Sequence, residues 1–242
     1  MGLPLSVPTL PELLNSADPT LEAHAVGKCT PQAVLAIAFL AHLLTRTLII
    51  CLFALCAARF ATGHVGLFCD AMLPTARGFQ SYFGYLDGAE SYTAHGNNMG
   101  FCGSSTDRSN STGPSFTATL EQTTNVAGSG GPFALDLWNG TAPARGWDGV
   151  YSSTMYSRVI GDKIEQHDPN KPLFLYAAFQ NVHEPIDAPD AFRDLYVNST
   201  NSSSRALFSA DVSALDDAVA NLTRNLQARG MWNDTLLIFT TE

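Results

Sequence analysis

The sequence predicts an α/β fold, and three segments support this prediction. The residues Leu173–Phe179 form a short apolar run without strict alternation, which is typical of a parallel strand covered on both faces. Apolar residues recur at helical spacing from about Ala206 to Ala228. A β-rich segment that includes Leu236–Phe239 follows this helix. We expect the core to contain these two strands, a third strand at Ala23–Val26, and the helices packed on them.

The first predicted element is a short helix that begins after Thr9. Thr9 and Glu12 form a T-x-x-E capping box, and Pro11 lies in the first turn, where proline is tolerated. The apolar residues on one face of this helix are Leu10, Leu13 and Leu14. We expect the strand Ala23–Val26 to come next.

The middle of the chain differs in composition from the rest. Residues 97–147 are rich in Gly, Ser, Thr and Asn and predict a long surface insert. Residues 151–167 then predict a helix with one apolar face. The residues of that face are Tyr156, Val159, Ile160 and Ile164.

His183 is the first candidate site residue. Polar residues directly follow the strand Leu173–Phe179, and Pro185 ends regular pairing just beyond His183. Ligands of open α/β sheets bind beyond the carboxyl ends of the strands, so a histidine at this place is a candidate ligand-binding residue. A loop histidine with satisfied hydrogen bonds is the alternative that the position leaves open.

Charge and composition restrict the function classes. The formal net charge is -9, and the 13 basic residues form no run, which argues against nucleic-acid binding. The five cysteines have no metal-binding or redox spacing, and Met1 is not followed by a basic signal-peptide region. Six N-x-S/T sequons indicate a glycoprotein of the secretory pathway. They begin at Asn110, Asn139, Asn198, Asn201, Asn221 and Asn233.

Three blocks of the sequence resemble the sulfatase family, and specifically arylsulfatase B-like members. The segment 172–185, the segment 73–92 and the segment 209–220 with 232–242 after it are similar to family blocks in the same order. The resemblance implies an alkaline phosphatase-like sulfatase domain with a mostly parallel central sheet, incomplete at both ends. It also implies a sulfuric ester hydrolase of the arylsulfatase type, whose substrate is a sulfated small molecule or glycan.

The resemblance assigns roles to four residues. Lys28, His64 and His183 match catalytic positions at which the family binds sulfate, and Glu242 stands where the family has an Asp that binds Ca²⁺. The family nucleophile is a formylglycine made from Cys or Ser in a C-x-P-S-R motif, and no cysteine of this chain lies in such a motif. We therefore expect the chain by itself to be inactive. The resemblance implies an extracellular or lysosome-like location.

The apolar segment 29–63 interrupts the resemblance and divides the chain into 1–28, the insert, and the domain continuation 64–242. In one interpretation, 33–58 is a transmembrane helix, since it exceeds the ~20 residues needed to cross a bilayer. His42 and Arg46 lie near its middle, where Arg costs roughly 2.5–3.5 kcal/mol. The chain would then be a catalytically dead, membrane-anchored sulfate-binding protein.

The second interpretation of this segment is a retained intron. Its removal joins Lys28 to His64 and gives the family motif Gly-Lys-Trp-His without its tryptophan. A tryptophan codon split after its first base would be read as Cys at the donor site and Gly at the acceptor site. These are the residues found at Cys29 and Gly63.

Overall fold

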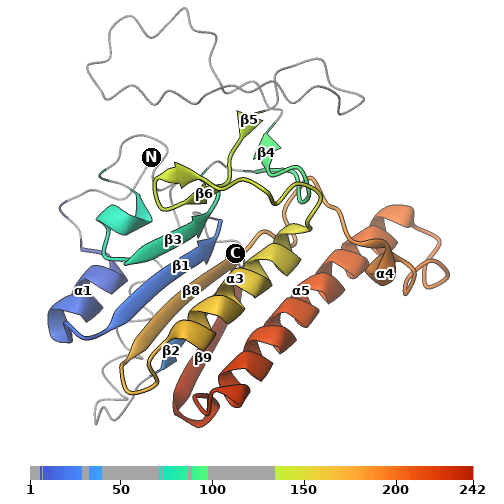
Figure 1. Cartoon of the computed structure of the whole chain (residues 1–242). Helices are drawn as coiled ribbons and strands as arrows, with labels where there is room; N and C mark the ends of the chain where they lie inside the picture. Colours follow the sequence, from blue (N-terminus) through green and yellow to red (C-terminus); the bar gives the residue numbers. More distant parts are fainter. Residues whose placement is uncertain are drawn as a thin grey trace, which may run out of the picture.

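The computed structural model shows an α/β fold with one main sheet (Figure 1). The residues that it describes are 6, 8–28, 33–39, 71, 73–86, 89–97 and 134–241. The strand order in the main sheet is β7-β6-β3-β1-β8-β2-β9. The strands β1, β3 and β8 are parallel to one another, and β9 runs in the same direction because β2 is antiparallel to both β8 and β9. The predicted fold class is therefore confirmed.

The central strand β8 (Leu173–Phe179) is buried on both faces, as its continuous apolar run predicts. One face packs against α3 (Ser152–Gln166) and α5 (Ser203–Ala228), and the other packs against α1 (Leu10–Ala17) and its neighbours. The side chains toward α3 and α5 are Leu173, Leu175, Ala177 and Phe179, and those toward α1 are Phe174, Tyr176 and Ala178. Two apolar clusters thus share one strand.

The amino-terminal elements form where the local signals place them. Helix α1 follows Thr9, whose backbone N–H donates to the Glu12 carboxylate, while the Thr9 hydroxyl donates to the Arg77 carbonyl at 2.6 Å. Strand β1 (Glu22–Gly27) comes next, and the turn η2 (Pro74–Ala76) leads into β3 (Ser81–Gly84). The capping box therefore fixes the start of α1 and also ties it to the turn before β3.

The predicted transmembrane helix at 33–58 is wrong for its described part. Ala33–Phe39 forms strand β2, which is hydrogen-bonded to β8 on one side and to β9 (Thr235–Thr241) on the other. A continuous apolar run does not distinguish a buried strand from a buried helix, which explains the error. Within the ranges given above, no helix has the length and apolar character needed to span a bilayer. Residues 40–58 lie outside the described part of the chain.

The region predicted as a surface insert has short strands at its start and near its end. β4 (Gly96–Asn97) pairs with β5 (Ala134–Leu135), whereas β6 (Trp138–Asn139) and β7 (Ala142–Pro143) extend the main sheet next to β3. Residues 98–133 lie outside the described ranges.

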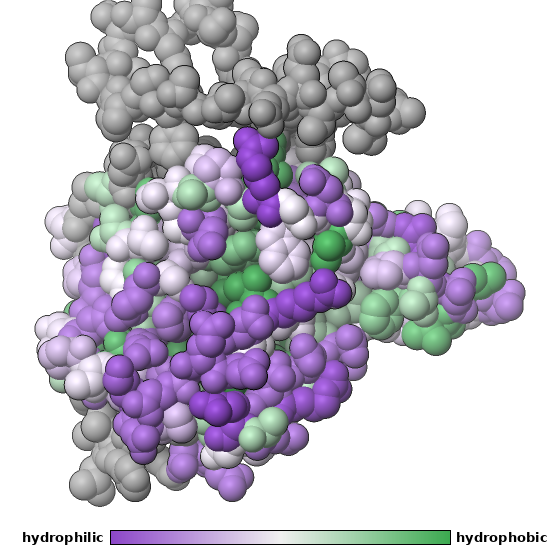
Figure 2. All heavy atoms as spheres, in the orientation of Figure 1, coloured by the Kyte–Doolittle hydropathy of each residue, from purple (hydrophilic) through white to green (hydrophobic). Residues whose placement is uncertain are grey.

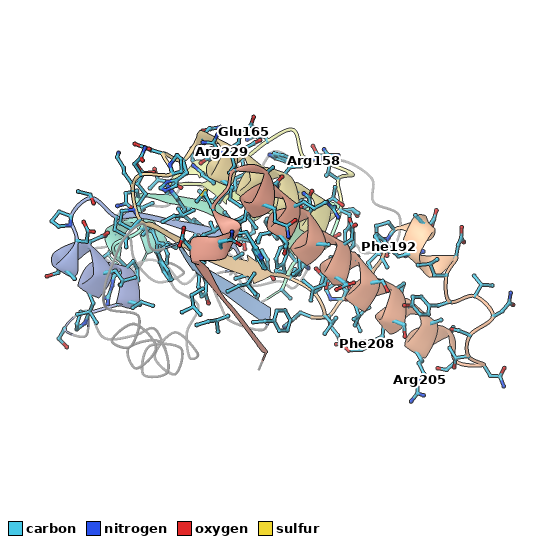
Figure 3. All side chains as sticks on the ribbon, turned by 90° about the horizontal axis from the view of Figure 1, so that it is seen from below. Arg158, Glu165, Phe192, Arg205, Phe208 and Arg229 are labelled. Atoms are coloured by element: carbon cyan, nitrogen blue, oxygen red, sulfur yellow. The ribbon has the colours of Figure 1, made fainter. Side chains whose placement is uncertain are left out.

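The two long helices lie side by side on one face of the sheet, and their outward surfaces are largely hydrophilic (Figures 1 and 2). The start of α5 and the short helix α4 (Asp190–Arg193) project beyond the sheet, and Phe192 and Phe208 lie in this projection (Figure 3). Its exposed apolar side chains are Leu195, Val197, Phe208 and Val212. The turn η3 (Trp232–Asp234) connects α5 to β9.

Candidate functional site

Lys28 lies at the carboxyl end of β1 and is buried. Its backbone N–H donates to the Ala178 carbonyl of β8 at 2.7 Å. The preceding residue, Gly27, has φ +108°, and a Cβ there would lie 1.9 Å from the Ala178 oxygen. Glycine is thus required for this close approach of β1 to β8, and the approach fixes the backbone of Lys28.

His183 lies just beyond the carboxyl end of β8, the parallel neighbour of β1. Its backbone N–H donates to the Gln180 carbonyl at 2.9 Å and closes a turn, and its side chain is partly buried. The imidazole Nδ1 contacts the carbonyl of Glu184. Parallel neighbours end at the same edge of a sheet, so the structure brings Lys28 and His183 to one edge. His64 and Glu242 lie outside the described residues.

The loop that carries His183 rests on a buried polar network. The Gln180 amide donates to the Glu90 carbonyl at 2.6 Å and accepts from the Ser152 hydroxyl at 2.8 Å. The next side chain, Asn181, donates to the Tyr151 hydroxyl at 2.9 Å and also contacts the carboxylate of Asp211 on α5. The loop is therefore held by α3, by α5 and by the segment 89–97.

Asp211 is the charged centre of this network. It is fully buried, it accepts from the Tyr151 hydroxyl at 2.7 Å, and the Tyr92 hydroxyl lies 3.3 Å from its second oxygen. Burial raises the pKa of the Asp211 carboxyl to about 6, against the opposing effect of hydrogen bonds from Tyr151, Asn181 and Tyr92. Burial, and then the charge of Asp211, raises the pKa of both tyrosines.

A second buried acid lies on the other side of Gln180. Glu90 accepts from the Tyr156 hydroxyl at 3.2 Å, and burial raises its pKa to about 7. The Nδ1 atom of His95 lies 3.8 Å from a Glu90 oxygen, while its Nε2 donates to the carbonyls of Trp147 and Val150 at 3.1 and 2.9 Å. Glu90 therefore holds a titratable proton inside the protein.

The sequence analysis did not identify Glu90, Tyr92, Tyr151 or Asp211. For Asp211 a signal was present, because it lies four residues before Leu215 on the apolar stripe of α5. A charged residue at a core position of a helix needs buried polar partners. The position of Asp211 in the sequence could therefore have identified it as part of a buried polar network.

The described part of the chain shows no cluster of metal-binding side chains. Within those ranges no three His, Cys, Asp or Glu side chains converge on a point that could hold a metal ion. The calcium prediction rested on Glu242, which lies outside these ranges. The calcium prediction therefore stays a prediction.

Comparisons with known proteins agree with this architecture. The profile of the sulfatase family matches residues 51–241. Arylsulfatase J of Mus musculus is 30% identical over 182 residues, which cover 74% of this chain and 25% of that protein. The crystal structure of Ps i-CgsB and that of Ps i-CgsB in complex with k-i-k-neocarrahexaose have TM-scores of 0.61 and 0.60.

These two structures share only 15% and 16% sequence identity with this chain, so the similarity shows the fold alone. Each similarity covers 97% of this chain and 39% of the solved chain. This chain therefore corresponds to a quarter to two fifths of the proteins that it matches. Because the family profile covers most of its length, the chain belongs to the sulfatase family.

Proposed function

We propose that this chain supplies the sulfate-binding side of a sulfuric ester hydrolase site, through Lys28 and His183. The observation that carries the proposal is their placement at the carboxyl edge of two hydrogen-bonded parallel strands, β1 and β8. Ligands of α/β sheets bind at this edge. Both residues also offer N–H donors to an anion, and a lysine ammonium carries the opposite charge to a sulfate group.

The roles of the two side chains follow from their chemistry. The Lys28 ammonium would neutralise a sulfate oxygen, and burial strengthens that attraction because the local dielectric constant is low. His183 would donate a hydrogen bond from its imidazole to a second oxygen. His64 is expected to add a third contact, in keeping with the family resemblance.

We further propose that the chain binds a sulfate group without hydrolysing an ester. In the family the nucleophile is a formylglycine in a C-x-P-S-R motif, and this sequence contains no such motif. Positioning and charge neutralisation alone do not provide the attacking oxygen. Incubation of the purified chain with a chromogenic sulfate ester should therefore release no product, and turnover would contradict this proposal.

Sulfate binding is tested by titrating the ¹⁵N-labelled chain with sodium sulfate and following its NMR spectrum. We expect saturable shifts of the His183 imidazole and of the amides near Lys28. The variant Lys28→Gln should lose these shifts. The matched control is Lys171→Gln, since Lys171 precedes β8 at the opposite edge of the sheet and is exposed. Equal sulfate affinity in the two variants would overturn the assignment of Lys28.

The exposure of the sequons supports the secretory location that we propose for this chain. The asparagines at 139, 198, 201 and 233 are exposed, whereas the Asn221 amide donates to the Ser157 hydroxyl at 2.7 Å. Expression behind a secretory leader, followed by glycosidase treatment and peptide mass mapping, should show glycans at exposed sites and none at Asn221. A chain secreted without any glycan would contradict the proposal.

A further inference from the structure

Asp211 lies beneath the loop that carries His183 and contacts it through two tyrosines. The rings of Tyr92 and Tyr151 are stacked, with centroids 5.1 Å apart and an interplanar angle of 10°. Their hydroxyl groups approach different oxygens of the same carboxyl group, Oδ2 for Tyr92 and Oδ1 for Tyr151. The carboxyl group is therefore the common partner of both hydroxyls.

The Tyr92 hydroxyl has more acceptors than it can satisfy. Its oxygen lies 3.0 Å from the His183 carbonyl, 3.3 Å from the Gln180 carbonyl and 3.3 Å from Asp211 Oδ2. A phenol carries one hydrogen and can donate fully to one of these acceptors at a time. The His183 carbonyl thus competes with the Asp211 carboxyl group for a single hydrogen.

The other Asp211 oxygen is already occupied. Oδ1 accepts from the Tyr151 hydroxyl at 2.7 Å and from the Asn181 amide. A proton that binds to Asp211 therefore belongs on Oδ2, the oxygen that faces Tyr92. The proton on Oδ2 can then be donated to the Tyr92 oxygen, which leaves the hydroxyl hydrogen of Tyr92 for a loop carbonyl.

We propose that Asp211 is a positioning residue for the His183 loop, which it controls through the Tyr92 hydroxyl. When Asp211 is protonated, Tyr92 donates to the His183 carbonyl and holds the loop. When Asp211 is ionised, its carboxylate is the stronger acceptor and takes the Tyr92 hydrogen, so the His183 carbonyl loses its donor. No atom other than one proton is gained or lost. The proposal deepens the proposed function, on which it rests for the role of His183.

The surroundings of Asp211 raise the pKa of its carboxyl group toward the physiological pH range. Burial raises the pKa of its carboxyl to about 6, and the nearby charge of Asp187 acts in the same direction. Asp187 is itself paired with Arg193 of α4. The titratable groups that act on Asp211 are Tyr92 and Tyr151, which donate hydrogen bonds to it, and Asp187, which is paired with Arg193.

The sequence provides a specific probe for the His183 carbonyl. His183 is the only histidine followed by glutamate, so ¹³C-carbonyl histidine combined with ¹⁵N glutamate gives one HNCO cross-peak, from His183 and Glu184. The full chain is titrated from pH 4.5 to 8. We expect the carbonyl signal to show a transition centred near pH 6 that reports the loss of the Tyr92 hydrogen bond.

Two variants test whether this transition comes from Asp211. In Asp211→Asn the side-chain amide donates to Tyr92 at every pH, so the carbonyl transition should disappear. Asp216→Asn is the matched control, because Asp216 is exposed on the same helix, and it should behave as the unmodified protein. A carbonyl transition that persists in Asp211→Asn would overturn the proposal, as would its absence from the unmodified protein.

A second variant covers the case in which Asp211→Asn does not fold. Tyr92→Phe keeps the stacked ring and removes only the hydroxyl, and it should also abolish the carbonyl transition. A retained transition in this variant would refute the role of Tyr92.

The titration contains no sulfate, so it does not depend on the proposed function. Sodium sulfate added afterwards at pH 6 tests that function separately. Absence of any sulfate-induced shift at His183 would refute sulfate binding and leave the Asp211 result unaffected.

Discussion

The close approach of β1 to β8 next to Lys28 leads to a sharp prediction for Gly27→Ala. The added Cβ would lie 1.9 Å from the Ala178 carbonyl oxygen, whereas real contacts of this kind are at least 3.0 Å. The strands must therefore separate locally by about 1.1 Å, the difference between 3.0 and 1.9 Å. The same shift would lengthen the 2.7 Å bond from the Lys28 N–H to about 3.8 Å, beyond hydrogen-bonding range.

The expected loss of stability has two parts. A non-glycine residue at φ +108° costs about 1–3 kcal/mol, and the broken hydrogen bond costs about 0.5–1.5 kcal/mol. The free energy of unfolding should thus fall by about 1.5–4.5 kcal/mol. For a chain of this size each kcal/mol lowers Tm by about 2–4 °C. Urea denaturation measures the free energy, and differential scanning calorimetry measures Tm.

Gly140→Ala is the matched control for this experiment. Gly140 also has a positive φ, +62°, but a Cβ there meets nothing within 4 Å. Gly140→Ala should lower the free energy of unfolding by only about 1–2 kcal/mol, the cost of placing a residue with a Cβ at a positive φ. Gly27→Ala should also lose the sulfate-induced shifts near Lys28, whereas Gly140→Ala should keep them. Equal free energies of unfolding for the two variants would refute the argument from the close approach.

Three further predictions concern buried groups. The raised pKa of Glu90, about 7 against an ordinary 4.5, means that the folded state binds the extra proton between these values. The free energy of unfolding should therefore fall by up to about 3 kcal/mol as pH rises through this window. In Glu90→Gln, urea denaturation should no longer show this fall. Burial lowers the pKa of His24 from 6.5 to about 4, so His24 destabilises the fold as pH falls through this window, and in His24→Gln the same measurement should show less acid destabilisation. Leu222 of α5 is fully buried in the apolar cluster that α3, α5 and β8 share, and Leu222→Ala should cost about 2–5 kcal/mol by urea denaturation; a loss below 1 kcal/mol would contradict its placement in the core.

The helices and the central strand could be predicted from the sequence because their signals are local. The T-x-x-E box at Thr9 and the apolar spacing of α3 and α5 depend on residues within a few turns. The placement of His183 at a strand end also follows from local pattern, together with the rule that ligands of α/β sheets bind there. The family resemblance placed Lys28 at the end of its strand. The family resemblance supplied their expected roles.

Only the tertiary structure decided the conformation of Ala33–Phe39 and the partners of Asp211. An apolar run is compatible with a helix or a strand, and here the open hydrogen-bonding edges of β8 and β9 select the strand. Asp211 and Tyr92 are 119 residues apart in the chain, and the residues around each of them do not indicate that the two are in contact. The sequence by itself therefore determined the helices, the central strand and the edge that bears the candidate site. Long-range packing determined the conformation of Ala33–Phe39 and the buried network that supports the site.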